Sequence, residues 1–427
     1  MGRAPTRLDA ARWLGLALSS AALVACYAPD PPAGAPCANG VCPTPLVCSQ
    51  ATNTCERSDI DAGGSGGNSY RVPITLSASV AATDVPVLVV LDASFSYTHA
   101  AVDGSDVRLA GDTAASEMPH WTETWNQGGV SRIWGRVPSV VAGSNTIYAY
   151  YGSPARTSSD FAAVFPNTYR TTGDATLGGA VTYDAVIIET GTIVTVQAGT
   201  PLAITAPYVR ITGTLTANAA GYAGAMGPGA GGMSTTGGAG GGGYGGDGGL
   251  GGKDPSDTPG TGGAAYGGAM TDIDMGSGGG VTDVATTGAH GGGAVRIEAR
   301  RIVVDGSIEA RGEAGMSAAR SGGGGAGGGV LLRAASLAFT GSIAVPGGAG
   351  GPMVNAGNDG GGGGGGGRIK LFEHGEIINS GMTDVAGGGG GVGGDTAPGQ
   401  PGLAGATYVG TSTMIDALPV VGSEQSI

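Results

Sequence analysis

The sequence predicts an all-β protein in which a β-sandwich is followed by a glycine-rich, right-handed parallel β-helix, or solenoid. Three observations support this fold class. Residues 70–155 contain alternating strand patterns and no helical period, and one strand pattern recurs several times in the second half of the chain. Glycine also divides the 427 residues sharply, because only 20 of the 90 glycines precede Gly213. The two halves are therefore expected to differ in architecture.

Residues 1–25 have the features of a signal peptide. Three arginines precede the apolar stretch at 13–25, which is too short to span a bilayer. The stretch ends in LVAC, which resembles the lipobox of bacterial lipoproteins. This resemblance implies cleavage before Cys26, acylation of its thiol and a membrane anchor. Tyr27 follows the cysteine instead of aspartate, which under enteric sorting rules favours the outer membrane, on its periplasmic or cell-surface face.

An ordinary signal peptide, with Cys26 left unmodified, is the alternative interpretation. The remaining cysteines cluster within residues 26–69, between proline-rich and glycine-rich linkers. An even number of cysteines in an exported segment predicts two disulfides, with three possible connectivities. Their spacing fits neither a redox motif nor a paired zinc ribbon. We therefore predict a small disulfide knot built from Cys37, Cys42, Cys48 and Cys55.

Residues 70–155 are predicted to form the β-sandwich, with a linker at 156–180. The successive motifs YRVPITL, DGSDVRL, HWTETWNQG and RIWGRVPSVVAGSNTIYAYYGSPA are similar to a widespread domain of unknown function in bacterial and archaeal surface proteins. That domain often stands beside lectin-like and repeat modules. The resemblance implies an exported, multidomain, cell-surface protein. It transfers no catalytic residues, because none is established for the family.

Two groups of residues in this domain have competing interpretations. Trp121, Trp125 and Trp134 are candidates for an aromatic platform that stacks on sugars, or else at least two of them anchor the core. Asp103 and Asp106 are candidate calcium ligands, but Asp-Gly and Ser-Asp pairs are also common in turns. The turn and core interpretations are the simpler ones.

The predicted solenoid, residues 181–415, rests on a repeated strand pattern that is clearest in GGGAVRIEARRIVVDGSIEARG at 291–312. Apolar residues occupy odd positions up to Ala299 and even positions from Ile302, so the two intervening arginines must form a corner. Each copy has a single row of apolar side chains, which is buried only when the copy stacks on its neighbours. Similar copies begin 93 residues earlier at Leu202 and 35 residues later at Val330, and a looser copy after Gly367 carries one extra residue before Ile377.

This pattern assigns side chains to the inside or the outside of the rungs. Ile297 and Leu332 are predicted to point inward, and the adjacent Glu298 and Arg333 to be ordinary surface residues. The intervening glycine tracts add no apolar area. They are expected either to be disordered or to pack as polyglycine II helices. Residues 416–427 are predicted to be a C-terminal tail.

Composition and motifs argue against several classes of ligand. The net charge is −13 and no basic cluster is interleaved with aromatic residues, which argues against a nucleic-acid partner. The four histidines are scattered. The calcium-roll-like nonapeptide at 242–250 has no tandem copies, so we predict no metal and no cofactor.

We therefore expect a non-enzymatic surface lipoprotein with a role in adhesion or envelope structure, for which polysaccharide is a candidate ligand. The alternative is a polysaccharide-degrading β-helix lyase or hydrolase. Its machinery would be the outward charges Glu298, Asp305, Glu309 and Arg311. A cleft with clustered carboxylates would favour the enzyme, and a face of glycine and small polar residues would favour adhesion.

Overall fold

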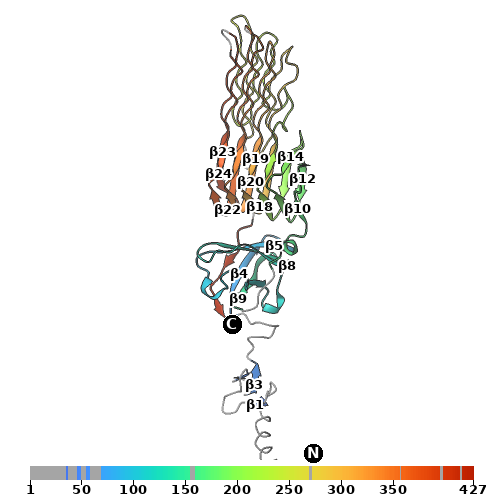
Figure 1. Ribbon diagram of the computed structural model, residues 1–427. Helices are drawn as coiled ribbons and strands as arrows, with labels where there is room; N and C mark the ends of the chain where they lie inside the picture. The colour runs from blue at the N-terminus through green and yellow to red at the C-terminus, as the bar shows by residue number, and fades with distance from the viewer. Residues whose placement is uncertain are drawn as a thin grey trace, which may run out of the picture. The chain divides into compact units, whose positions relative to one another are not determined.

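The computed structural model describes residues 35–36, 46–49, 54–57, 69–153, 159–268, 272–355, 357–394, 398–413 and 416–427 (Figure 1). The chain divides into two units, residues 1–67 and 68–427. Nearly all regular elements are β-strands, in large parallel and antiparallel sheets. Among the described residues, no helix has the length and apolar character needed to cross a membrane. The all-β class is thus confirmed.

The first unit contains a small antiparallel sheet within the predicted cysteine-rich segment. Strands β1 (Ala35–Pro36), β3 (Thr54–Arg57) and β2 (Leu46–Ser49) lie in that order. In the β2–β3 ladder, Cys48 is directly opposite Cys55. Cys26, Cys37 and Cys42 lie outside the described residues.

The second unit begins with two antiparallel sheets that enclose one apolar core. One sheet contains β4 (Tyr70–Ala78), β9 (Gly143–Tyr151) and β6 (Arg108–Ala110), and the other contains β5 (Ala82–Leu91), β8 (Ser131–Val140) and β7 (His120–Thr124). The alternating residues of both sheets are buried against one another, as in a sandwich. They include Val72, Ile74, Leu76, Val87, Val89, Leu91, Ile133 and Ile147.

Residues 416–427 do not form the expected tail. Strands β25 (Val420–Val421) and β26 (Gln425–Ser426) pair with β4 and extend the first sheet of the sandwich. Glu424 between them accepts a 2.6 Å hydrogen bond from the Tyr151 hydroxyl. Two-residue strands carry no periodic signal, and their partner is an edge strand more than 340 residues away.

The following strands form two parallel sheets. The first contains β10 (Thr168–Arg170), β13 (Ala185–Ile188), β16 (Tyr208–Ile211), β18 (Ala294–Val304), β20 (Gly329–Phe339), β22 (Arg368–Asn379) and β24 (Ala406–Thr411), with β12 (Gly179–Thr182) and β15 (Leu202–Thr205) joined through β18. The second contains β11 (Ala175–Leu177), β14 (Ile193–Val196), β17 (Thr214–Thr216), β19 (Ser307–Glu309), β21 (Ser342–Ala344) and β23 (Met382–Asp384).

The pairing register confirms the repeats predicted from sequence. Ile297 is opposite Leu332 on one side, at the 35-residue offset, and opposite Ile204 on the other, at the 93-residue offset. The extra residue of the loosest copy appears as an irregularity in β22, where Ile377 pairs with Leu337 after a register shift. The predicted inward residues of successive copies form one buried apolar cluster between the two sheets.

Strands also replace the predicted linker at 156–180. Asp160 caps the short helix α1 (Phe161–Val164), accepting a 2.8 Å hydrogen bond from the Ala162 amide. Strands β10, β11 and β12 then follow and pair in parallel with β13, β14 and β15. Elements of three or four residues are too short to show a period in the sequence.

One inside–outside assignment was wrong. Arg333, predicted to be an ordinary surface residue, is only 1% exposed. Its guanidinium pairs with Glu298 and lies 5.5 Å from the centre of the Phe372 ring. The outer face of the parallel sheet is covered at this point, and the period-2 pattern cannot distinguish a covered polar residue from a solvated one.

Part of that outer face packs against the sandwich. Val303 and Ala338, on outward positions of β18 and β20, join an apolar cluster with residues of β5, β8 and α1. The cluster also holds Tyr208 and Trp134, whose rings meet edge to face at 5.7 Å. The sandwich and the parallel sheets therefore share a core as well as a chain connection.

The glycine tracts are ordered into a bundle of extended segments. In Figure 1 these segments continue from one end of the parallel strands. The amides of residues 361–367 donate in strict rotation to three neighbouring segments. Gly361, Gly364 and Gly367 donate to Gly351, Gly348 and Val345; Gly362 and Gly365 donate to Ala239 and Gly242; Gly363 and Gly366 donate to Gln400 and Leu403.

A return to the same neighbour every third residue is the period of a polyglycine II helix. The tract at 238–243 shows the same rotation. The close packing leaves no room for side chains, since a Cβ built on Gly364 would lie 2.0 Å from the Gly325 carbonyl oxygen. Of the two states expected for the tracts, the structure has the ordered one.

Candidate functional site

The three tryptophans singled out from the sequence do not form a shared platform. Trp134 is fully buried, and its indole Nε1 donates a 2.9 Å hydrogen bond to Glu123. Trp121 packs edge to face against Phe161 and belongs to the same cluster. A buried indole cannot stack on a sugar, so the carbohydrate interpretation of Trp134 was wrong.

Trp125 lies in the separate core of the sandwich. Its ring meets those of Phe95 and Tyr97 edge to face, with centroid distances of 6.4 and 5.3 Å. Gly104 covers the ring with a backbone at φ +68°, and a Cβ there would come within 2.3 Å of the indole. Trp125 is thus a core anchor held under a glycine turn.

Asp103 and Asp106 act as turn residues. Asp103 accepts hydrogen bonds from the amide and hydroxyl of Ser105. Asp106 is 1% exposed and accepts 2.8 Å bonds from the amides of Ala101 and Gly152. A carboxylate that accepts two backbone bonds inside the domain is already satisfied, which supports the turn interpretation.

The outward charges of the parallel strands are paired with one another. Glu298 binds Arg296 at 2.9 Å in addition to Arg333. Asp305 lies 3.4 Å from Arg210, and Glu309 lies 3.5 Å from Arg311. These carboxylates are spread over different strands and do not gather into one cluster.

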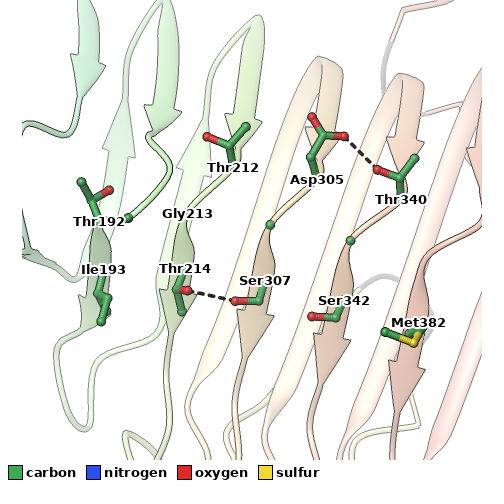
Figure 2. A pocket seen from close by; sticks show the side chains of 13 residues that line it. Thr192, Ile193, Thr212, Gly213, Thr214, Asp305, Ser307, Thr340, Ser342 and Met382 are labelled. Carbon is green, nitrogen blue, oxygen red and sulfur yellow. Dashed lines mark hydrogen bonds between the residues drawn. The ribbon is translucent and has the colours of Figure 1, made fainter.

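A shallow groove of about 570 Å³ crosses five successive turns of the second parallel sheet. Figure 2 shows its lining, which repeats one corner sequence from turn to turn. In four of the five corners a glycine separates a polar residue from the first residue of the next strand, and at the first corner Thr192 lies between Gly191 and the strand. The lining consists of Gly191, Thr192, Ile193, Thr212, Gly213, Thr214, Asp305, Gly306, Ser307, Thr340, Gly341, Ser342 and Met382.

Close stacking of the corners requires these glycines. A Cβ on Gly306 would lie 2.1 Å from the carbonyl oxygen of Gly213, and a Cβ on Gly341 would lie 2.0 Å from that of Gly306. Gly191 has φ +80°, which L-residues with side chains rarely adopt. The groove floor is therefore bare backbone because the corners would not otherwise fit.

Hydroxyl groups flank this floor at the spacing of the strands. Thr214 and Ser307 on neighbouring turns are linked by a 3.0 Å bond between their hydroxyls. The Thr340 hydroxyl donates a 2.8 Å bond to Asp305, the one carboxylate of the lining. Neighbouring strands lie about 4.8 Å apart, so the hydroxyl row repeats at about that distance.

The groove was not predicted from the sequence. The available signal was the recurrence of Thr-Gly-Thr, Asp-Gly-Ser and Thr-Gly-Ser at each turn. Because the turns are separated by up to 93 residues, only their stacking brings these triplets into one row.

Comparison with known proteins identifies one part of the chain. Residues 103–172 match a family described as a domain of unknown function, DUF2341. The matched segment includes β6 to β10 and therefore runs from the sandwich into the first parallel strand. No curated protein and no solved structure gives a significant match. The predicted resemblance to a domain of unknown function is confirmed over these residues.

Proposed function

We propose that this chain is a non-enzymatic surface protein whose parallel strands form a right-handed β-solenoid and bind polysaccharide along the groove at their corners. The groove supports this proposal most directly. Apart from Ile193, Asp305 and Met382, its lining is glycine and hydroxyl side chains, which is the composition expected for adhesion and not for catalysis.

The regular row of hydroxyls suits a polymer with a short repeat. Each turn offers donors and acceptors of the kind that sugar hydroxyls pair with, and successive turns repeat them along one line. Single contacts of this type are weak, but contacts made together by one polymer chain add through effective concentration. The proposed binding mode is thus multivalent, shallow and dependent on polymer length.

The carboxylates near the groove argue for binding over cleavage. A glycoside hydrolase needs two carboxyl groups facing the scissile bond. The groove lining holds Asp305 alone, and this carboxylate is engaged by Thr340 and Arg210. Polysaccharide cleavage, the alternative function, therefore has no supporting observation among the described residues.

The proposed location follows from the sequence. We infer an exported lipoprotein, acylated at Cys26, attached to the outer membrane and stabilised by disulfides in its cysteine-rich segment. The lipobox-like LVAC and the sequence resemblance to a domain of surface proteins support this location. Binding to polysaccharide or other envelope components would then occur in adhesion or envelope structure.

Removal of the hydroxyl row tests the proposed binding. The full chain carrying Thr214→Val, Thr340→Val and Ser342→Ala keeps β-compatible side chains but loses three of the groove's hydroxyls. We expect retention of the native chain in affinity electrophoresis through gels containing neutral or acidic polysaccharides, and at least tenfold weaker retention of the triple variant. Thr83→Val, on an exposed position of β5, is the matched control and should behave as the native chain. Equal retention of the triple variant and the control, or no retention by any polysaccharide, would contradict the proposal.

A further inference from the structure

Three carboxylates meet where two turns of the glycine bundle come together. Asp254 and Asp257 lie on one turn, and Asp359 precedes a glycine tract about a hundred residues later in the chain. One carboxylate oxygen of each lies within 4.8 Å of the others. Asp359 is fixed in place by backbone bonds to the segment beside it, since its amide donates to Ala319 and its carbonyl accepts from Ser321.

Asp359 is buried without a partner for one of its oxygens. The residue is 4% exposed, and its Oδ1 accepts no hydrogen bond. An unpaired buried carboxylate oxygen is costly, because burial removes the water that would otherwise solvate it.

Arg320, whose charge acts on Asp359, is already engaged by another carboxylate. Arg320 bonds to both carboxylate oxygens of Asp283, at 2.9 and 2.6 Å. Burial, together with the charges of Asp254 and Asp257, raises the pKa of Asp359 to about 6. Arg320 lowers this pKa, but to a smaller extent than burial and the two neighbouring carboxylates raise it.

We propose that Asp254, Asp257 and Asp359 bind one calcium ion at this junction. Carboxylate oxygens are the ligands that hard divalent cations prefer, and the group contains no sulfur or imidazole that would favour zinc or copper. Calcium completes its shell with backbone carbonyls and water in a flexible geometry, whereas magnesium demands a near-ideal octahedron. The ion would lie between the three carboxylates, one of which belongs to the buried Asp359.

This site is independent of the groove and of the proposed polysaccharide binding. It also goes beyond the sequence, from which no metal is expected. A bound ion would link the turn at 254–257 to the segment that ends at Asp359. Its consequence is a fixed arrangement of these turns.

Calorimetry on the full chain tests the site directly. After treatment with chelator, titration with calcium chloride at pH 7.5 should show one saturable site with an affinity at least ten times higher than for magnesium. Asp359→Asn, which preserves shape and removes the charge, should weaken calcium binding at least tenfold. Asp254→Asn, on the half-buried turn, should also weaken it and does not alter the buried position. Asp112→Asn, an exposed carboxylate of the sandwich, is the matched control for loss of one charge and should leave binding unchanged.

Hydrogen exchange provides a second measurement. Calcium should slow amide exchange in residues 253–258 and 357–361 of the native chain, and have no such effect in Asp359→Asn or Asp254→Asn. Absence of saturable binding, equal affinity for magnesium, or undiminished binding by both variants would each overturn the proposal. A misfolded Asp359→Asn chain, recognised by circular dichroism, would leave Asp254→Asn to decide between these outcomes.

Discussion

Nε of Arg301 on β18 donates a 2.6 Å hydrogen bond to the carboxylate of Glu123 on β7, and both side chains are less than a tenth exposed. The second oxygen of the same carboxylate accepts a hydrogen bond from Nε1 of the Trp134 indole. One buried acid thus ties the parallel sheet to the sandwich and orients a core tryptophan.

Glu123→Ala should destabilise this interface strongly. Removal of Glu123 leaves the buried Arg301 with only the more distant Glu376, 4.0 Å away, as counter-charge, which costs about 3–5 kcal/mol of unfolding free energy. Tryptophan fluorescence during urea unfolding measures the change, because the tryptophans after residue 25 all lie in the sandwich. Asp112→Ala, which removes the acid of an exposed pair with Arg71, should cost less than about 1 kcal/mol. Equal effects of the two substitutions would mean that the buried pair is not what holds the interface.

Ile297→Asp should disrupt the core between the parallel sheets. The side chain is fully buried between Ile204 and Leu332, so an aspartate there would be an unpaired charge costing several kcal/mol. Circular dichroism of the full chain during denaturation follows the loss. Ile297→Val, which removes one methylene, should cost only about 0.5–1.5 kcal/mol. A comparable loss from both changes would refute the inward assignment.

Glu298→Gln should be more damaging than a surface substitution. Its carboxylate neutralises Arg333, which is buried, so we expect a cost of about 2–4 kcal/mol. Glu309→Gln, at a more open ion pair with Arg311, should change stability by about 0.5 kcal/mol or less. Thermal unfolding of the two variants side by side gives the comparison. Similar midpoints would show that Arg333 does not depend on Glu298.

Gly364→Ala should disorder part of the glycine bundle. The new methyl would meet the Gly325 carbonyl oxygen at 2.0 Å, and backbone cannot yield as a flexible side chain can. Overpacking of this kind costs about 1–3 kcal/mol or more. Gly389→Ala is the matched control, because nothing lies within 4 Å of the added atom. Amide exchange in residues 345–351 should quicken in the first variant only; equal protection in both would contradict the tight packing.

Cys26→Ser should release the chain from membranes. The acyl chains of a lipoprotein supply about 0.8 kcal/mol of membrane-binding free energy per buried methylene, and serine cannot form the thioether that carries them. Fractionation of expressing cells into soluble and membrane material measures the distribution. Ser20→Ala, inside the predicted signal peptide, should leave the distribution unchanged. Unaltered membrane association of the Cys26 variant would exclude lipidation at this residue.

The strand pattern around Ile297 was sufficient to predict the buried apolar residues of its own repeats and the pairing of those repeats with one another. Those features follow from a repeated period and from equal offsets along the chain. The burial of Arg333 could not be predicted in this way, because what covers an outer face is set by tertiary contacts. The pairing of residues 420–426 with β4 was likewise hidden, since edge pairing uses backbone groups that every sequence shares.

The two candidate sites also differ in how far they could be predicted from the sequence. The groove was visible in principle, as glycine-centred triplets repeat at Gly213, Gly306 and Gly341. The meeting of Asp359 with Asp254 was not, because it depends on the rotation of hydrogen bonds among glycine segments with no side chains to mark their neighbours. Low sequence complexity conceals the register of such a bundle even where its packing is tight.

The glycine bundle and the apolar core of the parallel sheets contribute with opposite sign to the heat-capacity change of unfolding. Unfolding the apolar core of the parallel sheets exposes hydrocarbon and raises the heat capacity, whereas unfolding the bundle exposes mainly peptide groups, whose hydration lowers it. Cooling weakens hydrophobic burial but not hydrogen bonds of this kind. The apolar core of the parallel sheets and the glycine bundle therefore respond to temperature in opposite ways. On cooling, the core loses stability and the bundle keeps it.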